Sequence, residues 1–198
     1  MNRKKIEIKT IVYMTALIFG VSEILKFASG MIFSGFTSIK PQYPLEFGAG
    51  NCVLLLLIAP VFEEYLFRSG ICYSLRSERG FNRRIFLGMI VISVIETFFH
   101  GADIQQIPAA VFTSVMLSVV YFFTENINHT ILIHFLLNVI KFIPFGTYGY
   151  VNGFAIANVS HTIACAFLAA IGAVFFFGYF RPRYITHTYD TEIKVTPL

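Results

Sequence analysis

Long runs of apolar residues dominate this chain of 198 residues. A helix needs about 20 mostly apolar residues in sequence to cross a bilayer core about 30 Å thick. Six runs approach that length, at about residues 10–33, 47–75, 85–101, 107–123, 127–145 and 154–180. The pattern predicts an all-α fold, a polytopic transmembrane helical bundle of about six spans.

The composition supports a membrane protein and argues against a soluble one. Hydrophobic residues make up 56% of the chain and charged residues only 13%, whereas a typical soluble domain has about 25% charged residues. With a soft prior of about 150 residues per domain, residues 1–198 are predicted to form a single integral membrane domain. The net charge of +4 comes from short basic clusters between apolar runs. We therefore expect the lipid bilayer as a partner and no nucleic acid.

The basic residues are distributed unevenly between the two sides of the predicted bundle. With six spans, the amino terminus, the loop "RSERGFNRR" and the carboxyl-terminal tail share one side, and they hold 11 of the 15 Lys and Arg residues. The other side holds Lys40 alone. Cytoplasmic loops are rich in Lys and Arg, so both termini are predicted to be cytoplasmic, in a multi-pass protein of the plasma membrane. Residues 184–198 are the polar cytoplasmic tail of this prediction.

The stretch "IAPVFEEYLFRSG" places charged residues directly after an apolar run. A charged residue near the centre of a spanning helix costs about 2.5–3.5 kcal/mol. Glu64 and Arg68 are four residues apart, so they can pair on one helix face, while Glu63 is turned about 100° away. Pro60 inside a helix would kink it. Alternatively, the apolar run ends at Pro60 and an interfacial amphipathic helix begins there.

Other spans also carry polar residues. His100 lies at the end of the third run, in "VIETFFHG", and "ILIHFLLN" in the fifth run puts His134 and Asn138 on one helix face. Polar groups inside a membrane normally face the bundle interior and partner one another, which predicts one shared site with Glu63. At about 1.5 Å per residue, these side chains all lie within the bilayer, spread over about 14 Å of depth.

Some polar residues are expected to be structural. Glu23 and Lys26 are three residues apart in the first run, where they can pair. His129 is expected near a helix end at the membrane interface.

Three short motifs resemble those of one family. "EEYLFR" is similar to the EExxxR motif, "FFHG" to the second motif ending in His, and "HFLLN" to the HxxxN motif of the CPBP family, the CAAX proteases and bacteriocin-processing enzymes also called Abi proteins. The resemblance covers residues 51–142 as a catalytic core. The second motif is usually FxxxH, but Glu96 stands four residues before His100. That carboxylate either orients His100 or pairs elsewhere.

The resemblance implies an intramembrane endopeptidase that cleaves a membrane-associated peptide or protein. Glu63 and His100 would activate the attacking water, and His134 and Asn138 would stabilise the oxyanion. The site-supporting residues of this hypothesis are Glu64, Arg68 and Glu96. No metal or other cofactor is expected in the favoured version. A zinc version stays open, because Glu63, His100 and His134 form a His₂Glu set.

Two other functional classes compete with the protease. A non-catalytic membrane protein, such as a bacteriocin self-immunity factor, would keep the polar cluster as a contact between helices. A small transporter would use Glu and His as a proton relay, but the sequence has no visible inverted halves. The sequence does not select a substrate or an oligomeric state.

Overall fold

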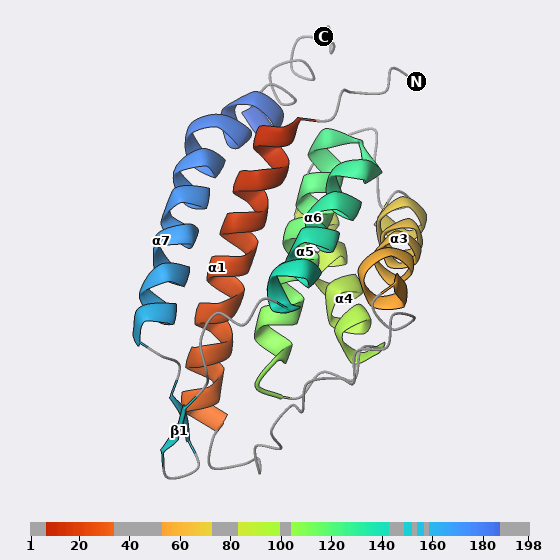
Figure 1. The fold of residues 1–198 in the computed structure, drawn as a ribbon. Helices are drawn as coiled ribbons and strands as arrows, with labels where there is room; N and C mark the ends of the chain where they lie inside the picture. Colours follow the sequence, from red (N-terminus) through yellow and green to blue (C-terminus); the bar gives the residue numbers. More distant parts are fainter. Residues whose placement is uncertain are drawn as a thin grey trace, which may run out of the picture.

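The structure is a computed structural model that describes residues 7–33, 53–72, 83–99, 104–142, 149–151, 154–156 and 159–186. These residues form a helical bundle with one short hairpin at its end (Figure 1). The elements are α1 (Ile8–Phe33), η1 (Leu54–Ile58), α3 (Ala59–Glu63), η2 (Glu64–Cys72), α4 (Arg83–Phe99), α5 (Ile107–Thr124), α6 (Ile127–Phe142), β1 (Gly149–Val151), β2 (Phe154–Ile156), α7 (Val159–Phe175) and η3 (Phe176–Thr186). The predicted all-α class is confirmed.

Some of these helices have the length and composition of membrane spans. Among the described residues, three helical stretches are long and apolar enough to cross a bilayer: Ile8–Phe33, Ile107–Thr124 and Ile163–Arg181. Ile127–Ile140 is a shorter apolar helix. The chain is therefore a membrane protein, and the count of six spans stays a prediction.

The sixth predicted span begins later than the sequence indicated. Phe154–Ile156 is strand β2, which pairs antiparallel with β1, and the helix α7 starts at Val159. The pairing of Val151 with Phe154 leaves two residues between the strands, and the sequence there is Asn-Gly, the dipeptide most typical of two-residue hairpin loops. At its other end, the helix continues through η3 to Thr186. It thus extends into the predicted polar tail, whose remaining residues lie outside the described part of the chain.

The helix that carries the charged motif is continuous through Pro60. The segments η1 and η2 are π-helical, and Ile58 and Glu64, which border α3, both have right-handed helical backbone angles. Pro60 lies in the first turn of α3, where the π geometry of η1 gives way to α geometry. A proline has no N–H to donate, so this continuous helix lacks one backbone hydrogen bond at Pro60. The alternative that the helix ends at Pro60 is wrong.

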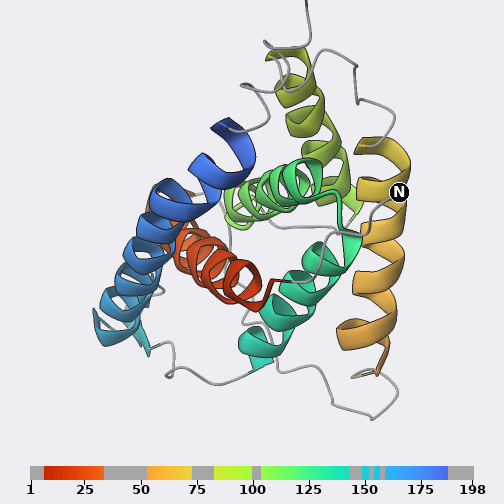
Figure 2. The same ribbon diagram turned by 90° about the horizontal axis from the view of Figure 1, so that it is seen from above.

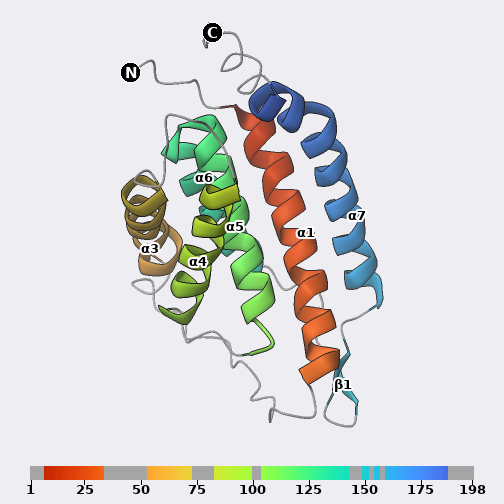
Figure 3. The same ribbon diagram turned by 180° about the vertical axis from the view of Figure 1, so that it is seen from behind.

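Helix α5 is the centre of the bundle. It packs against α1, α4, α6 and η2 (Figure 2). Viewed from behind, α7 and α1 lie on one side and α3 and α4 on the other (Figure 3). The segment formed by η1, α3 and η2 packs against α4, α5 and α6. Its charged side chains therefore meet residues from three other helices.

The ends of three helices meet at one end of the bundle. The backbone N–H of Glu7 donates to His129 Nε2 over 3.0 Å, and Tyr179 Oη lies 3.5 Å from Glu7 Oε2. These two contacts join the starts of α1 and α6 to η3. The three helix ends lie together, as expected if successive helices run in opposite directions. His129 lies near the start of α6, as predicted, and its side chain is only 1% exposed. The backbone hydrogen bond offsets part of the cost of its burial.

Helices α1 and α7 approach each other very closely. A Cβ atom built on Gly20 would lie 2.5 Å from the Cys165 carbonyl oxygen, and one on Gly172 would lie 2.5 Å from Leu17 Cβ. Lipid is as apolar as the side chains, so helices in a membrane associate through close packing rather than through the hydrophobic effect. Glycine at these two positions permits that packing.

We expect Gly20→Ala to destabilise the protein by about 1–3 kcal/mol, because the added methyl group overlaps the backbone of α7. Gly30→Ala is the matched control on the same helix, since a Cβ there meets nothing within 4 Å. The control should be neutral or stabilising by about 0.5–1 kcal/mol, because alanine favours helix more than glycine does. Thermal unfolding in detergent micelles measures both effects. Equal unfolding temperatures for the two variants would contradict the close packing.

Candidate active site

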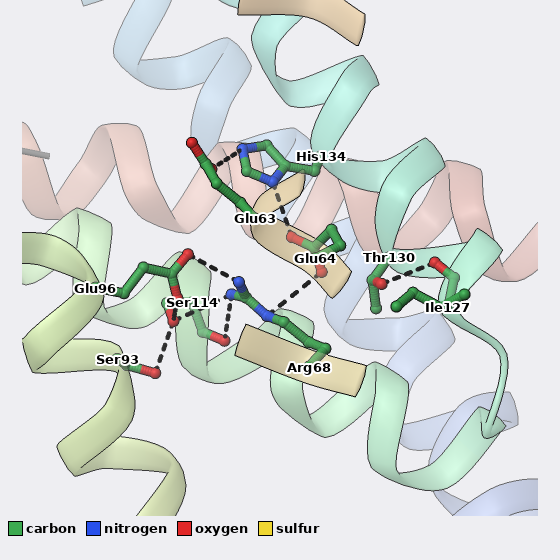
Figure 4. A network of polar contacts seen from close by, with 9 residues as sticks. All are labelled: Glu63, Glu64, Arg68, Ser93, Glu96, Ser114, Ile127, Thr130 and His134. Carbon is green, nitrogen blue, oxygen red and sulfur yellow. Dashed lines mark hydrogen bonds and ion pairs between the residues drawn. The ribbon is translucent and has the colours of Figure 1, made fainter. Parts of the chain in front are cut away.

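Two adjacent carboxylates lie on either side of one histidine ring (Figure 4). Glu64 Oε1 is 2.8 Å from His134 Nδ1, within hydrogen-bond distance. Glu63 Oε2 is 3.6 Å from His134 Nε2, which is too long for a direct hydrogen bond. An ionised carboxylate only accepts hydrogen bonds, so Nδ1 donates to Glu64. The contact with Glu64 therefore fixes the ring so that Nε2 faces Glu63.

A buried ion pair supports Glu64. Arg68 Nε lies 3.4 Å from Glu64 Oε2, and both side chains are fully buried. The pair predicted from the spacing of four residues is confirmed. Glu64 is thus held between a guanidinium on one side and the His134 ring on the other.

Arg68 also reaches two neighbouring helices. Its Nη1 donates to Glu96 Oε1 on α4 over 2.8 Å. Its Nη2 donates to the carbonyl and hydroxyl oxygens of Ser114 on α5, over 3.2 and 3.1 Å. Of the two roles open to Glu96, the structure thus describes a pairing with Arg68. One arginine joins η2, α4 and α5.

The sequence did not single out two serines of this network. Ser114 Oγ donates to Glu96 Oε2 over 2.5 Å, and the Ser93 and Ser114 hydroxyls are 2.8 Å apart. A signal was present in the sequence, because Ser93 stands three residues before Glu96, on the same helix face. Ser114, in the fourth apolar run, had no such neighbour. A buried serine usually has a hydrogen-bond partner, and here that partner comes from another helix.

Burial distinguishes Glu64 and Arg68 from Glu63 and His134. The side chains of Glu64 and Arg68 are fully buried, whereas those of Glu63 and His134 are 19% and 14% exposed. Glu63 and His134 are thus more exposed than the two residues that support them. A water molecule between two such groups is within reach of both.

The remaining two predicted catalytic residues are Asn138 and His100. Asn138 lies one helical turn after His134 on α6 and is partly buried. His100 lies outside the described residues, so its predicted place beside Glu63 stays a prediction.

The sequence estimate placed Glu63 and His134 at different depths in the bilayer, but in the structure the two side chains are in contact. Straight-helix arithmetic put Glu63 at about 20 Å and His134 at about 10 Å from the basic side. The two side chains nevertheless meet at 3.6 Å. The arithmetic counts backbone rise alone and leaves out the length of the two side chains.

The described residues contain no group of three His, Cys, Asp or Glu side chains that could hold a metal ion. The zinc alternative needs His100 as the third ligand beside Glu63 and His134. It therefore remains a hypothesis for experiment.

Comparison with known proteins identifies one family. A family model described as Rce1-like, type II CAAX prenyl endopeptidase, matches residues 45–140. No curated protein and no solved structure matches the chain. The matched segment includes all three motifs, and the predicted resemblance to the CPBP family is confirmed.

We expect Arg68→Gln to destabilise the protein by about 3–5 kcal/mol, because it leaves the buried Glu64 and Glu96 without their cation. Lys26→Gln is the control: Lys26 forms an ion pair with Glu23 on α1, but its side chain is 35% exposed. Loss of that pair should cost less than about 1 kcal/mol. Unfolding temperatures in detergent compare the two. Equal losses would mean that the Arg68 contacts contribute little.

Proposed function

We infer that this chain, whose residues 45–140 match the Rce1-like family model, is a CAAX-type intramembrane endopeptidase. The observation that carries the proposal is the arrangement around His134. Glu64 holds its Nδ1, and Nε2 faces the more exposed Glu63 at 3.6 Å. This geometry offers a base and a donor side by side in a site that is mostly enclosed by helices.

Glu63 is the proposed general base. It accepts a proton from water as the water oxygen attacks the scissile carbonyl carbon, and it returns that proton to the leaving amine. Glu64 is unsuited to this role because it is fully buried between Arg68 and His134. Glu63, with 19% of its side chain exposed, can reach the water. From the family resemblance, His100 is proposed to share the activation of that water.

His134 and Asn138 are the proposed donors to the oxyanion. Because Nδ1 already donates to Glu64, His134 would donate from Nε2 as the doubly protonated imidazolium. They stand on one face of α6, and the contact between Glu64 and Nδ1 fixes the ring orientation of His134. Donors held in place before the reaction lower the barrier without a cost of reorganisation. Glu64, Arg68 and Glu96 are proposed to supply that rigidity.

The proposed substrate is a membrane-associated peptide or protein, and the proposed location is the plasma membrane. The family name refers to a prenyl CAAX endopeptidase. A peptide that ends in a prenylated Cys-a-a-X box is therefore the first substrate class to test. Enzyme and lipid-anchored substrate would then meet in the same bilayer.

The departure at Glu96 does not argue for an inactive site. Glu96 contacts Arg68 and Ser114, and no contact between Glu96 and His134 is drawn (Figure 4). The arrangement of Glu63, Glu64 and His134 is present beside it. The pairing of Glu96 with Arg68 therefore supports the proposal of an active site over the non-catalytic alternative.

We expect Glu63→Gln to reduce the turnover number by about 10²–10⁴-fold, the usual contribution of a general base. The amide has the same shape but cannot accept the proton, so protein stability should change little. The measurement compares membrane-associated peptides by mass spectrometry in cells that express the wild type or the variant at equal levels. A product that disappears in the variant identifies the substrate by its new terminus.

Glu23→Gln is the matched control, because Glu23 is also a membrane-embedded carboxylate paired with a cation. It should give the wild-type peptide profile. If Glu63→Gln and Glu63→Ala also give that profile, Glu63 is structural and the non-catalytic function replaces the protease.

We expect activity to survive dialysis against a strong chelator, since the favoured mechanism uses an oxyanion site rather than a metal. Rate measurements before dialysis, after dialysis and after addition of zinc decide this point. Loss of activity that zinc restores would instead assign Glu63 and His134 to a zinc site.

A further inference from the structure

The close contacts of Arg68 are directed away from Glu64. Its guanidinium is 2.8 Å from Glu96 and 3.1 Å from the Ser114 hydroxyl, but 3.4 Å from Glu64. Within the described residues, Glu64 Oε2 has no hydrogen-bond partner. Arg68 is thus anchored by α4 and α5, and it acts on Glu64 through charge at a longer distance.

We propose that Glu96 is a positioning residue of the hydrolytic reaction, which holds Arg68 in place and thereby fixes Glu64 and the ring of His134. This inference rests on the proposed function. The contacts run in one line, from Glu96 to Arg68, from Arg68 to Glu64, and from Glu64 to His134 Nδ1. Each member of the line is partly or wholly buried, so no bulk water replaces a lost contact.

Both carboxylate oxygens of Glu96 are used in this network. Oε1 accepts from Arg68 and Oε2 accepts from Ser114, and the side chain is only 7% exposed. Such a side chain supports the site from behind and does not reach a substrate. Its effect should therefore appear in the turnover number and not in substrate affinity.

The charge of Glu96 matters as well as its shape. A buried guanidinium needs a compensating carboxylate, and hydrogen bonds between ionised groups are roughly twice as strong as neutral ones. Glutamine at position 96 would keep one acceptor oxygen but lose the charge. Phenylalanine, the residue usual in the family motif, would leave Arg68 and Ser114 without this acceptor. In this chain, the substitution toward the family pattern should therefore harm the enzyme.

The first test is kinetic and uses a quenched fluorescent peptide that ends in a farnesylated Cys-a-a-X box. We expect Glu96→Gln and Glu96→Phe to lower kcat on the order of 10- to 100-fold with little change in KM, because small displacements of catalytic groups have costs of this size. Glu96→Asp, which keeps the charge, should recover part of the rate. Glu23→Gln should match the wild type. Wild-type kcat in both Glu96→Gln and Glu96→Phe would overturn the proposal.

A double-mutant cycle tests whether Glu96 acts through Glu64. If both belong to one line of contacts, the combined loss of rate in Glu64→Gln with Glu96→Gln is smaller than the product of the separate losses. Independent, multiplying losses would overturn the proposal. Ser114→Ala serves as a second variant if Glu96→Phe does not fold, and it should lower kcat in the same direction because it removes a contact from both Glu96 and Arg68.

A spectroscopic measurement separates this inference from the proposed function. In protein labelled with ¹⁵N-histidine, the Nδ1–H proton of His134 is assigned by its loss in His134→Gln. We expect Glu96→Gln to shift that signal and Glu23→Gln to leave it in place. If the wild type does not cleave the farnesylated peptide, that substrate class is wrong, and the spectrum still decides the role of Glu96. An unshifted signal in Glu96→Gln would refute the positioning role.

Discussion

The buried guanidinium of Arg68 is the constraint on which this site depends. A charge without water must be compensated by neighbouring groups, or the protein loses several kcal/mol. Here the compensation comes from Glu64 on the same helical segment and from Glu96 on α4, with Ser114 of α5 as a further acceptor. Three elements that are separate in sequence must therefore take up one relative position. The same requirement that stabilises the bundle fixes the geometry of the site.

This constraint gives two adjacent glutamates different roles. Glu64 faces Arg68 and is fully buried, while Glu63 is on the more open side of the same helix. Both still contact the His134 ring, one at each nitrogen. Under the proposed function, Glu64 gives structural support and Glu63 carries out the chemistry, although the two residues are adjacent in the sequence.

The sequence predicted what depends on local spacing. The ion pair of Glu64 and Arg68 follows from a separation of four residues, and the bounds of α5 follow from one uninterrupted apolar run. The contact of Arg68 with Glu96 joins residues 28 positions apart and depends on the relative rotation of two helices. The spacing of residues within one helix gives no information about how that helix is rotated relative to another. For the same reason, Ser114 was not identified, although its hydroxyl is central to the network.

Helices outside the matched family segment also help to hold the site in place. Residues 45–140 include the charged motif and α4 to most of α6, whereas α1 and α7 lie outside the match. Two adjacent residues of α5, Thr113 and Ser114, connect the matched segment to α1. The Thr113 hydroxyl is 2.8 Å from Ser22 on α1, and Ser114 binds Glu96 and Arg68 on the other side. A displacement of α1 would thus move α5 and, with it, the acceptors that hold Arg68. The close packing of α1 on α7 is therefore part of what keeps the proposed catalytic groups in place.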